Sequence, residues 1–294
     1  MSITKYQIFL KTAACGSFSK AAEAMNFTQS GISHAINSLE AELGVTLLSR
    51  NRGGVVLTAD GRALLPQVEK LCAAHHSMMQ TVESLKGMDS GLVKVATFSS
   101  VSFQWLPRIL KSFGQLYPNI EFEVVTGDFY DQIENWIVSG AVDCGFFRLP
   151  STKHLQTYSL YRDEVQVVVP CDHPLAQADP FPVEELATEP FIRLAVGGDY
   201  EIMAAFDKMG IRPQVKYTAR EDRTILAMVS EGLGISLLPR LMAKHSPLPV
   251  QICRAPMQFD RPIGIGVKDE KALSKSTKLF VNYVRTWVAE NGEK

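Results

Sequence analysis

The sequence has few cysteines, no long apolar run and no excess of charge of either sign. Five cysteines are scattered over 294 residues without a C-x-x-C pair, which argues against a disulfide scaffold and against structural zinc. No apolar run reaches the roughly 18 residues that a membrane span needs, and the first residues lack the apolar core of a signal peptide. We therefore expect a cytoplasmic protein with no membrane partner and no bound metal.

The motifs of common enzyme sites are also missing. The chain has no P-loop, no G-x-S-x-G, no H-E-x-x-H and no G-x-G-x-x-G, so neither a catalytic site nor a cofactor is expected. Two alternatives are therefore disfavoured. The missing motifs disfavour an enzyme, and the missing apolar core of a signal peptide disfavours a solute-binding protein. The net charge of −1 does not indicate nucleic-acid binding, so any argument for DNA must rest on a placed motif.

The pattern along the chain predicts several domains. At about 150 residues per domain, a chain of this length suggests two or more. The apolar spacing is helical up to about residue 86; after the Gly- and Ser-containing stretch 86–91, apolar runs alternate with amphipathic helices, which is typical of α/β folds. We expect an N-terminal domain over 1–58, a linker helix and hinge over 59–91, and an α/β domain over 92–294. Its first lobe would comprise 92–162 and 268–294, and its second lobe 163–267.

The elements expected in the α/β region favour parallel sheets covered by helices. The expected strands are 92–98, 120–126, 142–147, 164–170, 191–194, 214–218, 236–238, 250–254 and 263–268. The expected helices are 105–117, 129–139, 183–187, 200–209, 223–231 and 274–290. Roughly 200 residues is large for one core of this kind, so two lobes are predicted.

Residues 18–43 carry the pattern of two short helices joined by a tight turn. Ser19 can cap the first helix, Asn26 suits a left-handed turn residue, and Thr28 can cap a second helix over 29–42. Small or apolar residues fall where the two helices must pack: Ala21, Met25, Phe27, Ile32 and Ala35. The pattern predicts a helix-turn-helix, and an ordinary helical hairpin with a solvated polar face is the alternative.

The start of the second helix presents short polar side chains at helical spacing. These candidate DNA-binding residues are Thr28, Gln29, Ser30, Ser33, His34 and Asn37. Such donors and acceptors suit base edges in the major groove of double-stranded DNA. Residues 47–58 then predict a two-stranded wing that turns at Gly53 and Gly54. Arg50 and Arg52 lie on this wing, where we expect them to contact the phosphate backbone.

Taken together, these motifs resemble the LysR-type transcriptional regulators. The matching residues are Phe9, Ala21, Ala22, Ile36, Leu39, Glu40, Leu48, Arg50, Leu57, Thr58, Gly61 and the stretches 16–19, 28–33 and 42–44. Leu48 departs from the phenylalanine usual at that position but stays apolar. The resemblance implies a winged helix-turn-helix, a linker helix that pairs with a second copy, and a two-lobed effector domain like the type 2 periplasmic binding proteins. It also implies a homodimer or homotetramer, and RNA polymerase as a partner.

The linker region predicts one long helix that Thr58 can cap and that runs to about residue 86. Along it, seven residues recur in alternating steps of four and three: Leu64, Val68, Leu71, His75, Met78, Val82 and Leu85. Such a seam favours pairing with a second chain, and packing on the helix's own domain is the alternative. Pro66 removes one internal hydrogen bond, so it kinks the helix or shortens its regular part.

Candidate effector-binding residues lie where the expected strands end, because ligands of α/β sheets bind at the carboxyl ends of strands near helix N-termini. They are Thr97, Ser99, Ser100, Ser102, Thr126, Phe147 and Arg148 in the first lobe, and Gly197 and Thr224 in the second. Their hydroxyls suit a small organic anion, whereas Asp128 and Asp131 oppose one, so the charge of the effector stays open.

Each of these candidates also has a purely structural alternative. The serines can simply cap a helix, and Arg148 can be a solvated loop charge. Of Phe146 and Phe147, one is expected in the core and the other in the cleft. Residues 220–223 are expected to form a self-neutralising surface cluster rather than ligand contacts.

The resemblance further implies how the two lobes are connected. The chain would cross between them near 160–164 and return near 264–267, and helix 274–290 would pack on the first lobe. Gly232 and Gly234 would serve a helix-to-strand turn. Control by oxidation is another alternative, which requires two of Cys144, Cys171 and Cys253 to meet.

Overall fold

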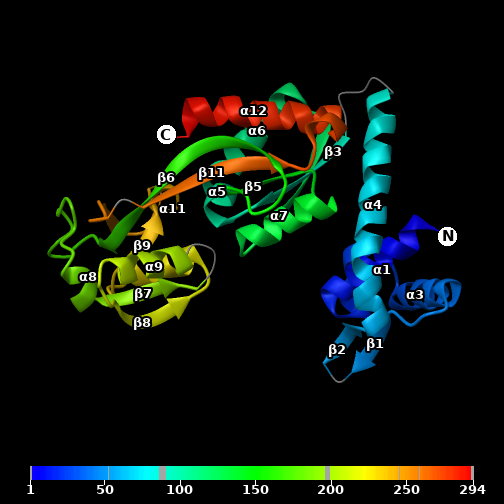
Figure 1. Ribbon diagram of the computed structural model, residues 1–294, viewed down its shortest axis with the longest axis horizontal. Helices are drawn as coiled ribbons and strands as arrows, with labels where there is room; N and C mark the ends of the chain where they lie inside the picture. Colours follow the sequence, from blue (N-terminus) through cyan, green and yellow to red (C-terminus); the bar gives the residue numbers. More distant parts are fainter. Residues whose placement is uncertain are drawn as a thin grey trace. The chain divides into compact units, whose positions relative to one another are not determined.

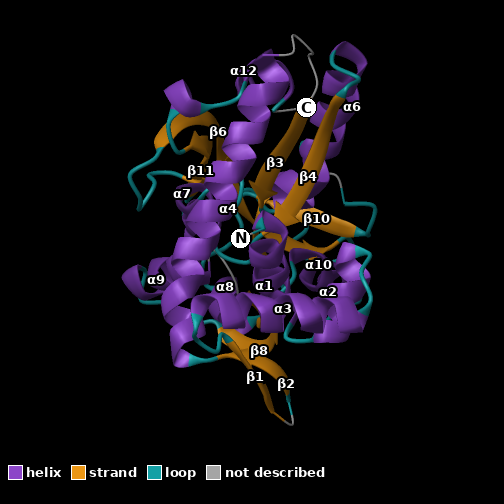
Figure 2. Ribbon diagram, turned by 90° about the vertical axis from the view of Figure 1, so that its right-hand side faces the viewer, coloured by secondary structure: helices purple, strands orange, loops and turns teal. Residues whose placement is uncertain are grey.

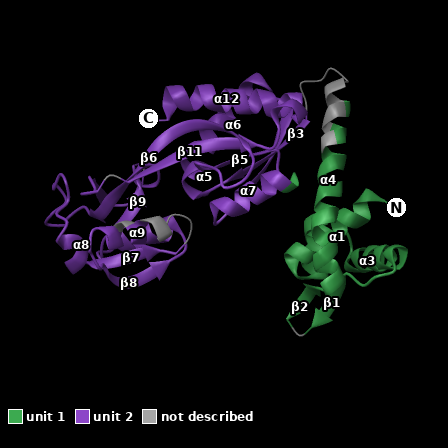
Figure 3. Cartoon of the chain, viewed as in Figure 1, with its two compact units in different colours: residues 1–88, 139–141 green, residues 89–138, 142–294 purple. Residues whose placement is uncertain are grey.

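The computed structural model describes residues 2–51, 53–85, 91–195, 199–244, 246–257 and 259–292. The chain divides into two compact units (Figure 3). One comprises residues 1–88 with 139–141, and the other comprises residues 89–138 and 142–294. We refer to them as the N-terminal unit and the effector unit.

The N-terminal unit is three short helices, a hairpin and a long helix. These are α1 Ile3–Cys15, α2 Phe18–Met25, α3 Gln29–Leu43, β1 Leu48–Asn51, β2 Gly54–Leu57 and α4 Ala59–Leu85. Their core contains Phe9, Ile32, Leu39 and Leu47, all fully buried. Burial of these side chains from the short helices and the wing fixes the angle at which α2 and α3 meet.

The turn between α2 and α3 confirms part of the sequence prediction. Asn26 has φ 56° in the left-handed region, and Thr28 Oγ1 accepts a hydrogen bond from the Gly31 amide at 3.1 Å. The cap of α2 is Ser17 rather than Ser19, because the helix already begins at Phe18. Phe27 does not pack between the helices as expected; it is 47% exposed, because the left-handed turn at Asn26 carries it out of the interface.

The predicted wing is an antiparallel hairpin in which Asn51 pairs with Gly54. Gly54 therefore belongs to the second strand rather than to the turn. It has φ 122°, and a Cβ atom there would lie 2.6 Å from the Gly16 carbonyl oxygen. The wing is thus held against the end of α1, where the Val55 amide donates to the same carbonyl at 2.8 Å. Arg52 lies outside the described residues.

The long helix α4 is capped as expected, since Thr58 Oγ1 accepts from the Gly61 amide at 2.9 Å. Pro66 lies inside it. The first part of its seam packs on the unit's own core, where Val68 is buried. Farther along, Leu71 is 44% and Met78 54% exposed. Packing on its own domain therefore holds for the first turns, and pairing of the later turns with a second chain stays a prediction.

The effector unit contains the remaining elements. They are β3 Gly91–Thr97, α5 Ser99–Gln104, α6 Leu106–Leu116, β4 Ile120–Thr126, α7 Tyr130–Ser139, β5 Cys144–Arg148, β6 Gln156–Pro170, α8 Glu185–Thr188, β7 Pro190–Leu194, α9 Asp199–Lys208, β8 Gln214–Ala219, α10 Asp222–Ser230, β9 Ser236–Pro239, α11 Arg240–Ala243, β10 Val250–Cys253, β11 Asp260–Val267, a 3-10 turn Glu270–Ala272 and α12 Lys275–Asn291.

The main sheet of this unit is mixed rather than parallel throughout. Its order is β10-β6-β11-β5-β3-β4, with β9 also paired to β6. As expected, β3 runs parallel to β4 (Figure 2) and to β5, and β7 runs parallel to β8. The strand β6 pairs antiparallel with β9, β10 and β11. The chain leaves the first lobe along β6 and returns beside it along β11, so these two strands run in opposite directions.

The two lobes are joined by β6 and β11. These strands pair from Glu164 with Asp260 to Gln156 with Val267. Residues 263–266 of β11 already pair with β5 inside the first lobe, so the chain returns at about residue 260 rather than at the expected 264–267. In the first lobe, α6 and α12 cover one face of the sheet and α7 covers the other (Figure 1), which confirms the expected packing of the last helix.

Candidate functional site

The start of α3 presents the polar residues that the sequence singled out. Gln29, His34 and Asn37 are exposed, as are Thr28 and Ser30, while Ser33 is half-buried. Thr28 is occupied as the helix cap and also lies 3.1 Å from the Ser30 hydroxyl. Ser19 Oγ donates to Gln29 Oε1 at 3.0 Å. The hydrogen bond from Ser19 of α2 to Gln29 of α3 therefore helps to hold the exposed polar face of α3 in place.

Arg50 extends this surface from the wing. Its guanidinium lies over the Phe18 ring, 4.5 Å from the ring centroid, and donates to Ser33 Oγ at 3.3 Å. The arginine thus lies beside α3 rather than projecting from the tip of the hairpin. Its positive charge remains exposed, next to the residues proposed to read bases.

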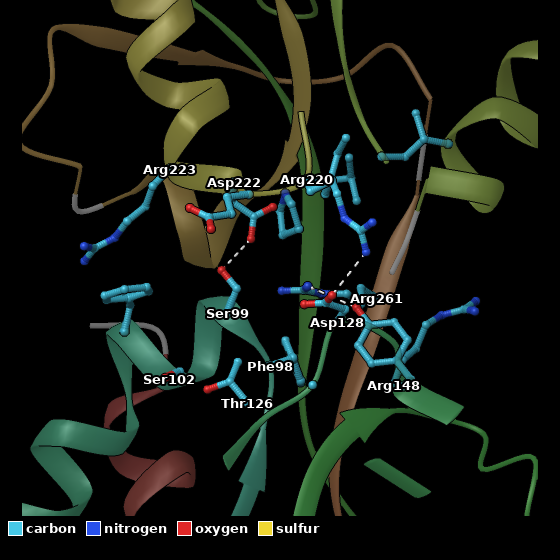
Figure 4. Close-up of a pocket in the computed structure, with 18 of the residues that line it drawn as sticks. Phe98, Ser99, Ser102, Thr126, Asp128, Arg148, Arg220, Asp222, Arg223 and Arg261 are labelled. Carbon is cyan, nitrogen blue, oxygen red and sulfur yellow. Dashed lines mark hydrogen bonds and ion pairs between the residues drawn. The ribbon is translucent and has the colours of Figure 1, made fainter. Parts of the chain in front are cut away.

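A cavity of about 430 Å³ lies between the two lobes of the effector unit (Figure 4). Much of its wall is apolar or aromatic: Phe98, Phe103, Tyr130, Val165, Leu194, Ile202, Pro239 and Phe259. Four arginines also line it, namely Arg148, Arg220, Arg223 and Arg261, together with the acids Asp128, Glu221 and Asp222. An apolar wall with a few placed charges is typical of small-molecule sites.

Three side-chain contacts join the lobes across this cavity. Ser99 Oγ of the first lobe donates to Asp222 Oδ2 of the second at 2.7 Å (Figure 4). Arg220 pairs with Asp128 at 3.3 Å, and the Arg223 guanidinium lies 3.2 Å from the Phe103 ring centroid. Residues 220–223 do not neutralise one another as expected, because Arg220 pairs with Asp128 and Asp222 with Ser99. The turn before α10 places all four in the lining of the cavity, with 220, 221 and 223 still exposed.

Arg261 links the cavity to the crossing strands. It pairs with Asp163 at 2.5 Å and donates to Ser100 Oγ at 2.7 Å and Tyr130 Oη at 3.2 Å. Burial lowers the pKa of Arg261, but Tyr130 and Asp163 outweigh it and raise that pKa above its ordinary value. Its buried Nε has no hydrogen-bond partner among the described residues.

Asp222 is the buried acid of the cavity. Burial raises its pKa above the ordinary value, and the hydrogen bond from Ser99 and the charge of Arg261 oppose that rise. A ligand that displaces the Ser99 hydroxyl therefore changes both the contact between the lobes and the proton affinity of this carboxyl.

Comparison with known families identifies both parts of the chain. Residues 3–62 match the bacterial regulatory helix-turn-helix protein, LysR family, and residues 86–289 match the LysR substrate binding domain. The chain belongs to the LysR family. It is a DNA-binding transcriptional regulator with an effector-binding domain and not an enzyme, as its relatives also indicate.

The regulator resembles curated relatives and solved structures over nearly its whole length. It is 30% identical to YvbU of Bacillus subtilis, an uncharacterized HTH-type transcriptional regulator, over 97% of this chain and 98% of the relative. It is 32% identical to LrrA of Synechococcus elongatus, a probable regulator, over 99% and 98%. The crystal structure of CbnR, a LysR family regulator, matches its fold with a TM-score of 0.72 at 22% identity, over 97% and 99%.

The structure brings only part of the predicted effector set to the cavity. Ser99, Ser102, Thr126 and Arg148 line it. Thr97, Ser100 and Phe147 do not line it, because all three are fully buried, with 1% exposure or less. Thr224 is exposed outside the lining, and Gly197 lies outside the described residues. The expectation for the phenylalanine pair is wrong, because β5 is an inner strand covered by helices and both Phe146 and Phe147 are core residues.

Sequence reasoning missed several lining residues, notably Phe98, Tyr130, Phe259 and Arg261. Phe98 and Tyr130 are aromatic residues that belong to no motif, and β11 brings Arg261, with Phe259 just before the strand, to the cavity from a distant part of the sequence. Within the described residues, no group of three or more His, Cys, Asp or Glu side chains could hold a metal. No described helix is long and apolar enough to cross a membrane.

Proposed function

We propose that this regulator reads promoter DNA with the start of α3 and binds a small, largely apolar organic anion between its lobes. The exposed polar face of α3 supports the first part, with Gln29, Ser30, Ser33, His34 and Asn37 as base readers. Thr28 sets the helix start, and Arg50 and Arg52 contact phosphates. The observation that carries the assignment is a capped, solvent-facing polar helix beside an exposed arginine.

The cavity supports an anionic group on an apolar body. The guanidinium of Arg148 lines the cavity at the end of β5. An effector carboxylate would accept hydrogen bonds from this guanidinium, with Ser99, Ser102 and Thr126 as further donors. The apolar and aromatic wall would cover the rest of the ligand.

The exposed later turns of α4 support self-association. The stripe containing Leu71 and Met78 would pair with the same helix of a second copy to form a homodimer, and dimers would pair as a homotetramer. Effector binding would then change the spacing of the DNA-reading helices. We further propose that the regulator acts on RNA polymerase in the cytoplasm. A solved relative, full-length CbnR, is complexed with its target DNA, which supports DNA as the partner.

The DNA assignment is tested with two matched serine substitutions on α3. Duplexes are first selected from random DNA with the full-length protein, and affinities for selected and scrambled duplexes are then measured by fluorescence anisotropy. Ser33→Ala should reduce discrimination by about 1–3 kcal/mol. Ser38→Ala should leave it unchanged, because Ser38 faces α1, where Lys5 donates to it at 2.8 Å.

Equal losses on selected and scrambled DNA would remove Ser33 from the base readers. Failure of the wild-type protein to bind any duplex at low salt would overturn the assignment of α3 as a whole.

A further inference from the structure

Two hydrogen bonds in the N-terminal unit occupy the oxygen atoms of two proposed base readers. Ser19 Oγ of α2 donates to Gln29 Oε1 at 3.0 Å, and Arg50 of the wing donates to Ser33 Oγ at 3.3 Å. The direction of both bonds follows from the groups themselves, because an amide oxygen only accepts hydrogen bonds and a guanidinium only donates them. Each reader therefore meets DNA with its oxygen already engaged.

The bond from Ser19 determines which end of the Gln29 amide is available to a base. Ser19 can make this bond because Ser17 caps α2 instead, accepting from the Lys20 amide at 3.4 Å. The oxygen and the nitrogen lie at opposite ends of a planar side-chain amide. An oxygen directed toward α2 therefore leaves the nitrogen directed away from it, so that Gln29 presents its two N–H donors.

Arg50 restricts Ser33 in the same sense. The Arg50 guanidinium lies over the ring of Phe18, which is only 9% exposed, so the arginine is held beside α3. With an N–H group on its oxygen, Ser33 has its O–H to offer as a donor, and the positive charge of Arg50 disfavours a second donor at that oxygen. Ser33 follows Gln29 by four residues on α3, so the two donors lie on one face, about one helical turn apart.

A face that presents donors selects particular atoms of the major groove. The acceptors there are the keto oxygens of guanine and thymine and the N7 atoms of the purines, whereas the amino groups of cytosine and adenine are donors. A donor placed against an amino group leaves both groups without a partner in the interface, which is unfavourable. An amide that could use both of its ends would instead suit adenine, through the adenine amino group and N7.

We propose that Gln29 and Ser33 recognise acceptor atoms of the base edges, and that Ser19 and Arg50 are the positioning residues that determine this choice. The proposal rests on the assignment of α3 as the DNA-reading helix and adds the chemistry of the atoms that it reads. Exclusion of water at the interface strengthens a hydrogen bond, so the bond between Ser19 and Gln29 persists in the complex.

The test uses base analogues in a duplex selected with the full-length protein, and affinities are measured by fluorescence anisotropy. Gln29→Ala first identifies the base pairs that Gln29 reads, since base substitution there no longer changes the affinity of this variant. At such a pair, one set of duplexes lacks an acceptor: 2-aminopurine replaces guanine, 5-methyl-2-pyrimidinone replaces thymine, or a 7-deazapurine replaces the purine. A matched set lacks the amino group: 2-pyrimidinone replaces cytosine, or unsubstituted purine replaces adenine.

The wild-type protein should bind at least one acceptor-deleted duplex about fivefold more weakly or worse, and the amino-deleted duplexes within about twofold of the unmodified one. Ser19→Ala should shrink the loss on the acceptor-deleted duplex to about twofold, because the amide can then turn its oxygen toward the bases. Ser19→Thr keeps the hydroxyl and should keep the loss. Ser38→Ala is the control, because Ser38 accepts from Lys5 instead, and it should also keep the loss.

Each loss is expressed relative to the affinity of the same variant for the unmodified duplex, so a phosphate contact made by Ser19 itself cancels. Ser19 is exposed, and both of its variants should keep the wild-type circular dichroism and unfolding midpoint. A merely structural role of Ser19 would weaken all duplexes alike and leave the relative losses unchanged.

The proposal is overturned by any of three results: no loss on the acceptor-deleted duplexes, a loss on the amino-deleted duplexes, or an equal relative loss in wild type and Ser19→Ala. These results leave α3 as the reading helix, because Gln29→Ala has still identified the contacted pairs. If Gln29→Ala relaxes no position, the proposal fails together with the assignment of Gln29 as a base reader. The Ser33→Ala measurement then decides separately whether α3 reads bases.

Discussion

Single residues of the N-terminal unit were predictable where the local backbone conformation requires a particular type of residue. Asn26 and Gly44 are left-handed, and Thr28 and Thr58 cap helices, since each role depends on local chemistry. Phe27 was not predictable, because its exposure depends on how the turn is oriented. Contacts with DNA bases remain predictions.

Residues of the effector cavity were predictable only at strand ends. Ser99, Ser102, Thr126 and Arg148 follow strands whose carboxyl ends meet at one edge, and all four line the cavity. Arg261 and Asp163 are 98 residues apart in the chain, and their pairing depends on the register of β6 against β11. No sequence pattern encodes that register, so the buried pair was missed.

The buried carboxyl of Asp222 should make the stability of the effector unit depend on pH. Burial raises its pKa above the ordinary 3.8, so the folded protein binds more protons than the unfolded chain above that value. The free energy of unfolding should therefore fall as pH rises from about 4 through the raised pKa, by up to about 1.4 kcal/mol for each unit of pKa difference. Urea unfolding of wild type and Asp222→Asn over this range measures it.

Asp222→Asn should lack this decline, because the amide cannot ionise and its oxygen still accepts from Ser99. A difference between wild type and variant that is constant with pH would show that Asp222 titrates as an ordinary carboxyl. Asp128→Asn is the control, since Asp128 lines the same cavity but is exposed.

At the scale of elements, most helices and strands were predictable from the sequence. The pairing of each strand with its neighbours in the sheet was harder to predict. Residues 120–126 form a strand with the predicted ends, because its apolar run has clear boundaries. The strand β6 is 15 residues long, twice the expected length, since its first half has polar side chains and shows no continuous apolar run. The short helix α5 was missed because serines at 99, 100 and 102 are typical of caps and turns.

The turn between α10 and β9 gives a prediction at this scale. Gly234 has φ 151°, and a Cβ atom there would lie 2.1 Å from the Pro190 carbonyl oxygen. That oxygen also accepts from the Ile235 amide at 2.9 Å, so it cannot withdraw without breaking the bond. Gly234→Ala should lower the free energy of unfolding by about 3 kcal/mol or more, as measured by urea denaturation.

Gly232→Ala in the same turn separates the close contact from the backbone strain. Gly232 has φ 73° with no neighbour within 4 Å of an added Cβ, so its substitution should cost only about 1–2 kcal/mol. Equal losses at the two glycines would show that the Pro190 contact adds nothing.

At the scale of the whole molecule, the order of parts was predictable because each part has its own pattern. Helical periodicity gives way to alternating strands and helices near residue 91, and a compact unit boundary lies at 88–89. The sequence predicted that two segments cross between the lobes, but it placed the returning segment at 264–267, whereas the chain returns at about residue 260. Apolar β11 residues continue from one lobe into the next without a break in the sequence pattern.

The two-unit organisation gives the prediction that tests the effector class. In a thermal-shift screen, aromatic and aliphatic monocarboxylates should raise the unfolding temperature of the effector unit, by an amount equivalent to about 2.7 kcal/mol at 100 times the Kd. They should not stabilise the N-terminal unit. Arg148→Gln should reduce the shift.

Arg212→Gln is the control, because Arg212 lies on the second lobe outside the cavity. A panel in which only cations or uncharged compounds stabilise the protein would contradict the anionic effector. Loss of the shift in the control variant would show that Arg148 acts through general charge alone.

The paired strands β6 and β11 also bear on how such regulators diversify. Both ends of the second lobe leave the first side by side on one antiparallel ladder, where Glu164 of β6 pairs with Asp260 of β11. The second lobe is therefore an insertion whose ends meet, and a different lobe can be grafted at this residue pair without rethreading the first. Recombination at this residue pair would exchange one half of the recognition chamber while the DNA-reading apparatus and most of the other half stay intact, which is a direct route to new inducer specificities.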